Sequence, residues 1–269
     1  MRALVLKLGG ELLEAPAQRA AIAAMAATTT STRPLALIHG GGRAIDAELA
    51  RRQIAPKKVD GLRVTDAPTL EAVVAVLAGS ANTELVAALV GAGVRAVGLT
   101  GVDAAFGRAT RTAAHRSTSG AVVDLGFVGD PVDAEPALIR LLIGAGYVPT
   151  IASLGIDAAS DQVPAQVLNV NADVMACRVA AALGGCDLVI AGGTPGVLGD
   201  DGRSIPRLTI AGIDDVIARG TATAGMVAKL SACRTALDAG VASVRLIDGR
   251  ALDGSHGVDD APGTTLTKN

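Results

Sequence analysis

Aromatic residues are almost absent from this chain of 269 residues. It has no Trp, one Tyr and two Phe, although half of its residues are apolar. Because aliphatic side chains must then fill the interior, we expect a sizeable core of Ala, Val, Leu and Ile. The length is sufficient for one large domain or for two lobes that share a core.

Cysteine and histidine are also scarce. The cysteines are Cys177, Cys186 and Cys233, and the histidines are His39, His115 and His256. The cysteines are odd in number, and their spacing fits neither a disulfide framework nor a zinc site. We therefore interpret them as small apolar fillers of a protein in the reducing cytosol. The histidines are scattered along the chain, which argues against a histidine-rich metal site.

The sequence has no cluster of basic residues and no long apolar run. Its net charge is -2 and its pI is near 5.9, so we expect neither a nucleic acid nor an anionic membrane as a partner. No uninterrupted apolar run reaches the ~18 residues of a membrane span. The N-terminus lacks the features of a secretory signal, and we expect a soluble, cytoplasmic protein.

Short apolar runs alternate with helical patterns along the chain. The runs predict strands over residues 2–8, 34–38, 94–99, 147–152, 187–191 and 242–247. The helical patterns cover roughly residues 17–27, 43–53, 66–91, 134–145, 171–183 and 226–239. Continuous hydrophobicity is typical of strands that are buried on both faces, so the alternation predicts a mostly parallel sheet with helices on both sides. Residues 107–130 interrupt the pattern and predict a β-hairpin that projects from the sheet end.

Two glycine clusters follow predicted strands. Gly9 and Gly10 come directly after the first strand, and His39 to Gly42 lie between the second strand and a helix. Glycine lets a backbone N–H approach a ligand, and a helix N-terminus favours an anion. A tight turn explains Gly9-Gly10 equally well, whereas the longer cluster favours phosphate or carboxylate binding. Lys7, at the end of the first strand, is then placed to face a phosphate.

Three further segments carry polar side chains near predicted helix starts. Asn169, Asn171 and Asp173 alternate, so an extended segment would present all three on one side; alternatively, Asn171 caps the next helix. Arg63 offers a planar fork that matches a carboxylate, although an ion pair with the aspartate three residues on is as plausible. Lys229, taken alone, is an ordinary solvated helix lysine.

Several known nucleotide fingerprints are missing. The chain has neither the G-x-x-x-x-G-K-[ST] pattern of P-loop proteins nor the motif set of protein kinases. Residues 91–96 match G-x-G-x-x-A, but this pattern precedes a strand instead of opening a helix. A dinucleotide-dependent oxidoreductase is therefore disfavoured.

The motifs taken together resemble the amino acid kinase superfamily and, within it, the acetylglutamate kinases. The similar segments cover nearly the whole chain and keep their order and spacing. They are Lys7-Leu8-Gly9-Gly10, His39-Gly40-Gly41-Gly42, Gly61-Leu62-Arg63-Val64-Thr65-Asp66, Gly98-Leu99-Thr100-Gly101-Val102-Asp103, Asp124-Leu125-Gly126-Phe127-Val128-Gly129, Leu168-Asn169-Val170-Asn171-Ala172-Asp173, Pro195-Gly196-Val197-Leu198, Gly225-Met226-Val227-Ala228-Lys229 and Gly263-Thr264. The Gly-Leu-Arg-Val-Thr-Asp and Asn-Val-Asn-Ala-Asp segments point to the acetylglutamate kinases over their relatives.

This resemblance implies a three-layer α/β/α sandwich with a mostly parallel central sheet. Residues 1–180 would form an N-terminal lobe that binds the acyl amino acid and contacts a second subunit, and residues 181–269 would bind ATP. The implied partners are ATP and N-acetyl-L-glutamate, with Mg2+ carried by ATP and no metal site of the protein itself. The implied subunit arrangement is a homodimer; because the chain begins without the N-terminal helix that links dimers of arginine-inhibited relatives into hexamers, we expect no arginine feedback.

The resemblance also implies roles for single residues. Lys7 and Lys229 would contact the transferring phosphoryl group from both sides, and Asp173 would hold the two lysines in place. The implied substrate-binding residues are Gly41, Gly42, Arg63, Asn169 and Asn171. The implied phosphate- and ATP-binding residues are Gly9, Gly10, Thr194, Gly196, Gly225 and Met226. The hairpin at 107–130 is similar to a lid over the substrate.

Two departures from the family pattern lie in the nucleotide half. Gly193 stands where the family usually has an aspartate, and Ala224 stands where Gly or Asp is common. Two alternatives also stay open. One is a sister carboxylate kinase for an aminoadipate derivative or N-succinylglutamate, and the other is a non-catalytic amino-acid sensor on the same fold.

Overall fold

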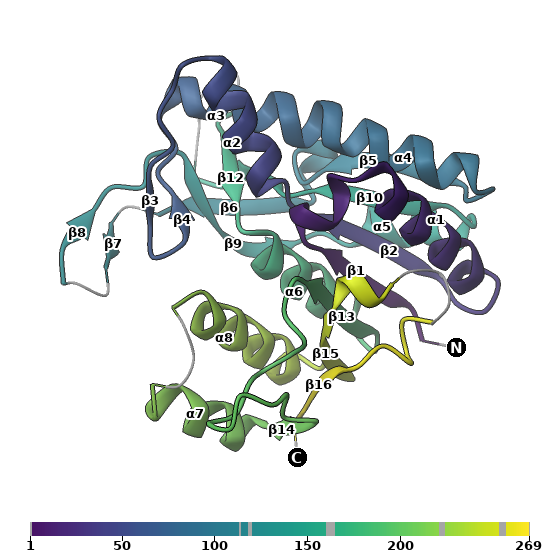
Figure 1. Ribbon diagram of the computed structural model, residues 1–269. Helices are drawn as coiled ribbons and strands as arrows, with labels where there is room; N and C mark the ends of the chain where they lie inside the picture. The colour runs from purple at the N-terminus through teal and green to yellow at the C-terminus, as the bar shows by residue number, and fades with distance from the viewer. Residues whose placement is uncertain are drawn as a thin grey trace.

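A mostly parallel sheet forms the centre of the molecule (Figure 1). The computed structural model describes residues 2–112, 114–117, 120–159, 165–220, 224–252 and 257–268. Eight described strands lie in the order β14-β16-β15-β13-β1-β2-β10-β5. Their bounds are β1 Leu4–Leu8, β2 Leu35–His39, β5 Ala96–Thr100, β10 Val148–Ala152, β13 Asp187–Gly192, β14 Arg207–Thr209, β15 Ser243–Asp248 and β16 Gly263–Thr267. Among these neighbours only β15 and β16 pair antiparallel.

The central strand β1 is buried along its whole length. It pairs in parallel with β2 on one side and β13 on the other, with Leu8 opposite His39 and Ala191. Its five residues are buried because helices cover both faces of the sheet, as the continuous apolar run predicts. This register also places the carboxyl ends of β1, β2 and β13 together at one edge, where ligands bind in open α/β sheets.

Helices cover the two faces of the sheet. On one face, α1 (Pro16–Thr30) packs beside α4 (Asn82–Gly91). On the other face lie α5 (Ala137–Gly144), α6 (Ala172–Leu183) and α8 (Ala224–Asp238), with α7 (Ile210–Ala218) between β14 and α8. The predicted three-layer α/β/α sandwich is therefore confirmed. The boundary between lobes at residue 180 stays a prediction.

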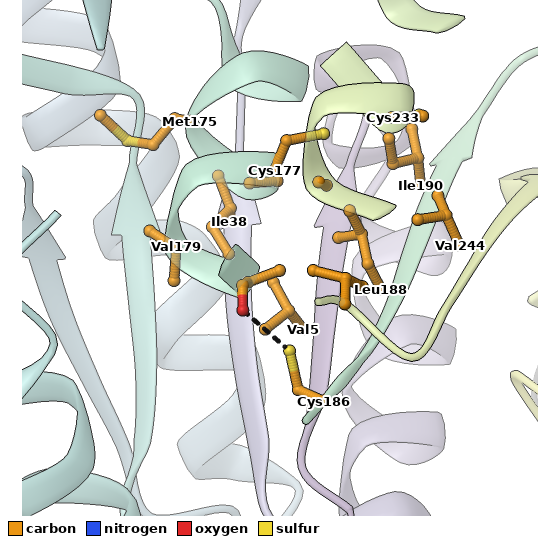
Figure 2. Close-up of a cluster of buried hydrophobic side chains, with 14 of the residues drawn as sticks. Val5, Ile38, Met175, Cys177, Val179, Cys186, Leu188, Ile190, Cys233 and Val244 are labelled. Carbon is orange, nitrogen blue, oxygen red and sulfur yellow. Dashed lines mark hydrogen bonds between the residues drawn. The ribbon is translucent and has the colours of Figure 1, made fainter. Parts of the chain in front are cut away.

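Aliphatic and sulfur-bearing side chains fill the core between the sheet and α6 and α8. Figure 2 shows Val5, Ile38, Leu188 and Val244 pointing from the strands toward these helices. Cys186 closes one end, where its thiol donates to Ala180 O at 3.2 Å. Burial raises the pKa of the Cys186 thiol to about 11. All three cysteines are free and buried, which confirms that they are apolar fillers.

A small closed barrel of four strands lies at the carboxyl edge of the main sheet. It contains β6 (Gly107–Arg111), β9 (Val128–Ala134), β11 (Leu154–Asp157) and β12 (Val167–Val170). The antiparallel β6–β9 pair is the base of the predicted hairpin, and β7 (His115–Arg116) pairs with β8 (Val122–Val123) farther out. Figure 1 shows β7 and β8 extending away from the body. The predicted projecting hairpin is confirmed.

The remaining short elements surround the same edge. Helix α2 (Gly42–Arg51) begins at the last residue of the second glycine cluster. Strand β3 (Lys58–Val59) pairs with β4 (Leu62–Arg63). Single 3-10 turns lie at η1 Gly10–Leu13, η3 Asp103–Ala105 and η4 Gly249–Ala251.

The segment predicted as one helix over 66–91 contains three parts. Helix α3 (Ala67–Val74) continues through a π-helical stretch, η2 (Ala75–Ala81), into α4. Among the described residues, Ala67–Gly91 is the one helix long and apolar enough to cross a membrane, with a mean hydropathy of 1.8 and a third of its most apolar window buried. The buried amide of Asn82 donates to Leu99 O and Thr150 O, which attaches this helix to β5 and β10.

Candidate active site

Two lysines from distant elements meet one buried carboxylate at the carboxyl edge of the sheet. Lys7 Nζ, at the end of β1, lies 2.8 Å from Asp173 Oδ1. Lys229 Nζ, in the second turn of α8, lies 3.7 Å from Asp173 Oδ2. The side chains of Lys7, Asp173 and Lys229 are 10%, 16% and 18% exposed. The structure thus brings together the three residues that the resemblance implies for catalysis.

The charge of Asp173 is stabilised by its two partners. Burial raises the pKa of this carboxyl group, but the ammonium groups of Lys7 and Lys229 outweigh burial and hold the pKa below its usual value. The residue lies in the first turn of α6, where the helix dipole also favours a negative charge. Asp173 is therefore ionised at neutral pH and holds both ammonium groups beside the same point.

Asn171 caps the helix that carries Asp173. Its Oδ1 accepts hydrogen bonds from Asp173 N at 2.9 Å and Val174 N at 3.2 Å. The capping alternative from the sequence is therefore confirmed. Asn171 also lines the adjacent cavity, so its predicted contact with substrate stays a prediction.

The two glycine clusters touch each other. A Cβ added to Gly10 would lie 2.7 Å from Gly41 Cα, 2.8 Å from Gly41 N and 2.9 Å from Gly42 N. Only a glycine at position 10 permits this approach of backbone to backbone. Gly41 is the N-cap of α2, and Gly42 is its first residue. The unpaired N–H groups at the N-terminus of α2 therefore lie beside the end of β1.

The turn after β13 begins beside Lys229, because a Cβ built on Gly192 would lie 3.8 Å from Lys229 Nζ. Gly196 has a φ of +116°, and a Cβ there would lie 2.5 Å from Thr264 Oγ1. Thr264 Oγ1 in turn accepts a hydrogen bond from Val197 N at 2.8 Å. Thr194 is exposed in this turn, and Gly225 begins α8 together with Ala224. Met226 is half-buried one residue later.

A cavity of about 370 Å³ adjoins the lysine–aspartate cluster. It lies between the second glycine cluster, the β3–β4 hairpin, the base of the β6–β9 hairpin and the start of α6. Its lining includes Ala172 and Ala228, the chain neighbours of Asp173 and Lys229. The base of the hairpin predicted as a lid contributes Thr112 and residues 128–131 to this lining.

Arg63 enters the cavity wall with one end of its guanidinium group unpaired. Its Nη2 donates to Gly42 O at 3.0 Å and lies 2.6 Å from Asp46 Oδ1. Its Nη1 is buried and has no partner among the described residues. Burial raises the pKa of Asp46, but hydrogen bonds from Lys58 and Arg63 outweigh this and lower it. A buried donor without a partner is costly, and Arg63 also belongs to the lining of the cavity, so its guanidinium group is a candidate to bind a carboxylate there.

Asn169 lines the same cavity from β12. Its Nδ2 donates to Thr65 Oγ1 at 3.1 Å, and the fully buried Thr65 hydroxyl donates to Arg63 O at 3.1 Å. This bond uses one of the two N–H groups of the Asn169 amide, so the other N–H and the oxygen remain available to a ligand in the cavity. The sequence motif identified Asn169, whereas Thr65 and Asp46, which orient Asn169 and Arg63, were not identified.

His39 is buried at the end of β2 in an unusual state. Its Nδ1 donates to Gly40 O at 3.1 Å, and Nε2 has no partner among the described residues. Burial lowers the pKa of the imidazole to about 4, so the ring is neutral at physiological pH. His39 therefore contributes no positive charge to the glycine cluster that follows it.

The carboxylates near the glycine turns are few, which suits a metal ion that is bound mainly by a phosphate ligand. Among the described residues no group of three or more His, Cys, Asp or Glu side chains is placed to hold an ion. One carboxylate, that of Glu11, lies at the glycine turns after β1 and β13. Mg2+ is usually bound by one or two carboxylates together with phosphates and water, which matches this arrangement.

Comparisons with known sequences agree on one family. Residues 2–248 match the model of the amino acid kinase family. The acetylglutamate kinase of Symbiobacterium thermophilum is 41% identical over 255 residues, which cover 93% of this chain and 85% of that protein. The acetylglutamate kinase of Solibacter usitatus is 40% identical, with 92% of this chain and 91% of that protein covered.

Solved structures share the fold. A protein of Streptococcus mutans UA159 is 26% identical, with a TM-score of 0.79 over 99% of both chains. The N-acetylglutamate synthase of Neisseria gonorrhoeae, solved with coenzyme A and N-acetyl-glutamate, has a TM-score of 0.81 at 24% identity, and this chain spans 60% of its length. The latter likeness shows the fold alone.

Proposed function

This chain belongs to the amino acid kinase family, and we propose that it phosphorylates the side-chain carboxylate of N-acetyl-L-glutamate with Mg-ATP. The product is N-acetyl-L-glutamyl 5-phosphate, and the reaction is the second step of arginine biosynthesis. Two relatives that are 40–41% identical over more than nine-tenths of the chain are acetylglutamate kinases. We place the enzyme in the cytoplasm, where this small-molecule biosynthesis takes place.

The observation that carries this proposal is the lysine–aspartate cluster beside the cavity. Lys7 and Lys229 are both attached to Asp173, and the cavity next to them contains a buried guanidinium nitrogen without a partner. A sensor needs a pocket for its ligand but has no use for two ammonium groups aimed at one point. A site that joins two anions needs both.

Charge neutralisation is the main task of catalysis here. A carboxylate is a nucleophile at neutral pH, so the reaction needs no general base. A carboxylate oxygen attacks the γ-phosphorus of ATP and forms a P–O bond, while the bond to the bridging oxygen of ADP breaks and ADP leaves with that electron pair. Lys7 and Lys229 offset the charge on the transferring group, and the N–H groups of the glycine turns add fixed dipoles.

The cavity orients the acceptor. The guanidinium group of Arg63 binds the α-carboxylate, and the side-chain amide of Asn169 binds the acetylamino group, because both residues line the cavity. The side-chain carboxylate then points toward Asp173 and its lysines, because Ala172 and Ala228 line that end of the cavity. Asn171, Gly41 and Gly42 complete the substrate contacts. The hairpin excludes water, which would hydrolyse the acyl phosphate.

ATP binds at the opposite side of the lysines, on the lobe formed by residues 181–269. Its phosphates contact the glycine turn after β1 and the N-terminus of α8, and the remaining contacts come from the turn after β13. The residues concerned are Gly9, Gly10, Thr194, Gly196, Gly225 and Met226. The Mg2+ that ATP brings neutralises phosphate charge when bound.

We further propose that the enzyme is a homodimer through the β5 edge of the sheet. Among the described strands, β5 pairs with a neighbour on one side only, and its sequence Ala-Val-Gly-Leu-Thr is mostly apolar. A hollow of about 670 Å³ beside it is lined by Val86, Val90 and Leu99, and Val90 is 56% exposed. An open apolar strand edge readily pairs with another chain, and a twofold axis here would cover both copies.

The test is a coupled assay with four acceptors offered separately. N-acetyl-L-glutamate, N-acetyl-L-aminoadipate, N-succinyl-L-glutamate and free glutamate are each incubated with Mg-ATP, and ADP release and hydroxylamine-trapped acyl phosphate are measured. We expect hydroxamate chiefly with N-acetyl-L-glutamate. Lys7→Ala should lower kcat on the order of a hundredfold, because one preorganised donor is lost.

The matched control is Lys268→Ala, which removes an exposed lysine outside the site. Equal losses in both lysine variants would contradict the role of Lys7. Hydroxamate with another acyl amino acid alone would keep the mechanism and change the substrate. Binding of N-acetyl-L-glutamate without any phosphoryl transfer would instead favour the sensor.

A further inference from the structure

Glu11 places a carboxylate over the first glycine turn. The residue follows Gly10 in the short η1 turn, and its side chain folds back over Gly9. A Cβ added to Gly9 would lie 2.4 Å from Glu11 Oε1 and 2.6 Å from Oε2. The carboxylate can occupy this position because residue 9 has no side chain.

The same carboxylate faces the turn after β13. Glu11 Oε1 lies 3.7 Å from a Cβ position built on Gly192 and 3.6 Å from one built on Gly193. Lys229 Nζ lies 3.8 Å from the same Gly192 position. The Glu11 carboxylate and the Lys229 ammonium group therefore both lie within 4 Å of the Cβ position built on Gly192, a position that glycine leaves empty.

Glu11 is exposed, and it takes part in none of the ion pairs found among the described residues. The ion pairs of the site use Asp173 for both lysines, and the nearby Arg43 pairs with Glu14 at 3.5 Å. An ATP molecule in the proposed position would bring its phosphates beside a free carboxylate. The negative charges of the phosphates and of the Glu11 carboxylate would repel each other, unless a cation lay between them.

We propose that Glu11 is a protein ligand of the magnesium ion that ATP carries, binding it directly or through one coordinated water. This inference rests on the proposed kinase function and adds a metal-binding residue to it. Mg2+ prefers carboxylate and phosphate oxygens, keeps several waters and needs one or two protein carboxylates. A lone carboxylate beside a phosphate site, with glycines leaving room for the hydrated ion, meets these requirements.

The proposal makes opposite predictions for ATP with and without its metal. As a magnesium ligand, the carboxylate attracts Mg-ATP and repels free ATP. As a group that merely fills an empty anion site, it would weaken the binding of both forms. The dependence of ATP affinity on Mg2+ is therefore the quantity that decides the question, and it requires no turnover.

The experiment measures nucleotide affinity by calorimetry for the wild type, Glu11→Gln and Glu11→Asp, once with saturating MgCl2 and once with EDTA. For Glu11→Gln we expect Mg-ATP affinity to fall about tenfold, as is typical when a metal contact is lost, and metal-free ATP affinity to stay equal or rise. Glu11→Asp should keep part of the magnesium effect, because the carboxylate remains. With Mn2+ in place of Mg2+, electron paramagnetic resonance of the bound Mn-ADP should change in Glu11→Gln.

The control is Glu14→Gln, which removes a nearby exposed negative charge that is paired with Arg43. It should leave the ratio of the two affinities unchanged. A Glu11→Gln variant that binds both forms of ATP more tightly, or that keeps the wild-type ratio, would overturn the inference while the proposed kinase function stands. A wild type that binds no ATP under either condition would overturn both.

Discussion

Buried charges in this protein are paired by residues far apart in the sequence. Asp173 is shared by Lys7 and Lys229, and Arg63 is held by Asp46. Removing one partner from such a group leaves an uncompensated charge, which costs more than an exposed ion pair contributes. These residues are therefore linked to stability as well as to chemistry, and variants of them need a folding control.

His39 is the buried residue whose titration should be visible in stability. Its pKa falls from 6.5 to about 4 on folding because burial disfavours the charged ring. The unfolded chain therefore binds the proton more readily between these values. The free energy of unfolding is therefore highest above pH 6.5, where His39 is neutral in both states. It falls by about 3 kcal/mol in total as the pH is lowered toward about 4.

Urea denaturation across this range measures the effect. The free energy of unfolding of the wild type should fall as the pH is lowered from 6.5, and the slope should be smaller in His39→Gln, which has no group to protonate there. As a reference, the pH dependence of the free energy of unfolding is also measured for each protein above pH 6.5. Identical pH slopes for the two proteins in the acidic range would show that His39 is not the titrating group.

At the level of elements, the site depends on the contact between two turns. The end of β1 and the start of α2 approach each other through Gly10 and Gly41, backbone against backbone. This contact sets the distance between Lys7 and the N–H groups of α2. The turns carry no side chains that could adjust to an insertion, so the arrangement is rigid.

Gly10→Ala should separate these turns. The new Cβ would lie 2.7 Å from Gly41 Cα, and backbone atoms cannot move away as the end of a side chain can. We expect a loss of about 1–3 kcal/mol in the free energy of unfolding and a fall in kcat on the order of a hundredfold, because a shift of about 1 Å misplaces the reacting groups. Thermal unfolding and the hydroxamate assay measure the two effects.

Gly144→Ala provides the comparison. Gly144 ends α5, and a Cβ there would meet nothing within 4 Å. Alanine in a helix is more stable than glycine by roughly 0.5–1 kcal/mol, so this variant should be as stable as the wild type or slightly more so. If Gly10→Ala behaved like Gly144→Ala, the contact between the two turns would have no role in either stability or activity.

At the level of the whole molecule, the sheet has one edge that differs from the other. At the β14 end of the sheet, the three-residue strand β14 follows the antiparallel pair of β15 and β16. At the other end lies β5, a mostly apolar strand beside α4, whose Val90 is exposed. The long helix that contains α4 is unusually apolar, with a mean hydropathy of 1.8 over its most apolar window. A second subunit on this face would account for that composition in an otherwise ordinary α/β protein.

Val90→Lys tests the proposed dimer. Light scattering after size-exclusion chromatography should show the wild type as a dimer and the variant as a monomer, because a charge in the centre of an apolar interface is costly to bury. Leu141→Lys, which changes a residue that is 70% exposed on α5 at the other face, should remain a dimer. A dimer in both variants would place the interface elsewhere.

Six of the eight strands of the main sheet were predicted from the sequence, each with boundaries within about two residues of those observed. Strands β1, β2, β10 and β13 are continuous apolar runs, and such runs need burial on both faces. Helix α7 and strands β14 and β16 were not predicted. Strands β14 and β16 lie at one end of the sheet, and their sequences Arg-Leu-Thr and Gly-Thr-Thr-Leu-Thr mix polar and apolar residues, so they lack the continuous apolar run of a central strand.

The candidate site was only partly visible in the sequence. Lys7, Asp173 and Lys229 were named through the family resemblance, and the structure brings them together. Glu11 and Asp46 were not named, although each is close to a motif. A single acidic residue carries no pattern of its own, and its meaning depends on what lies opposite it in space.

The sequence by itself determined the layered α/β architecture, the turns that need glycine and the family. Each of these depends on local hydrophobicity, on backbone conformation or on the spacing of residues along the chain. The family resemblance implied that Asp173 holds Lys7 and Lys229, and the structure shows both contacts. Only the tertiary structure decided that Gly10 touches Gly41 and that Glu11 faces Gly192. The physical reason is that such contacts depend on the order of strands in the sheet, which brings β1 between β2 and β13 and is not encoded in any single segment.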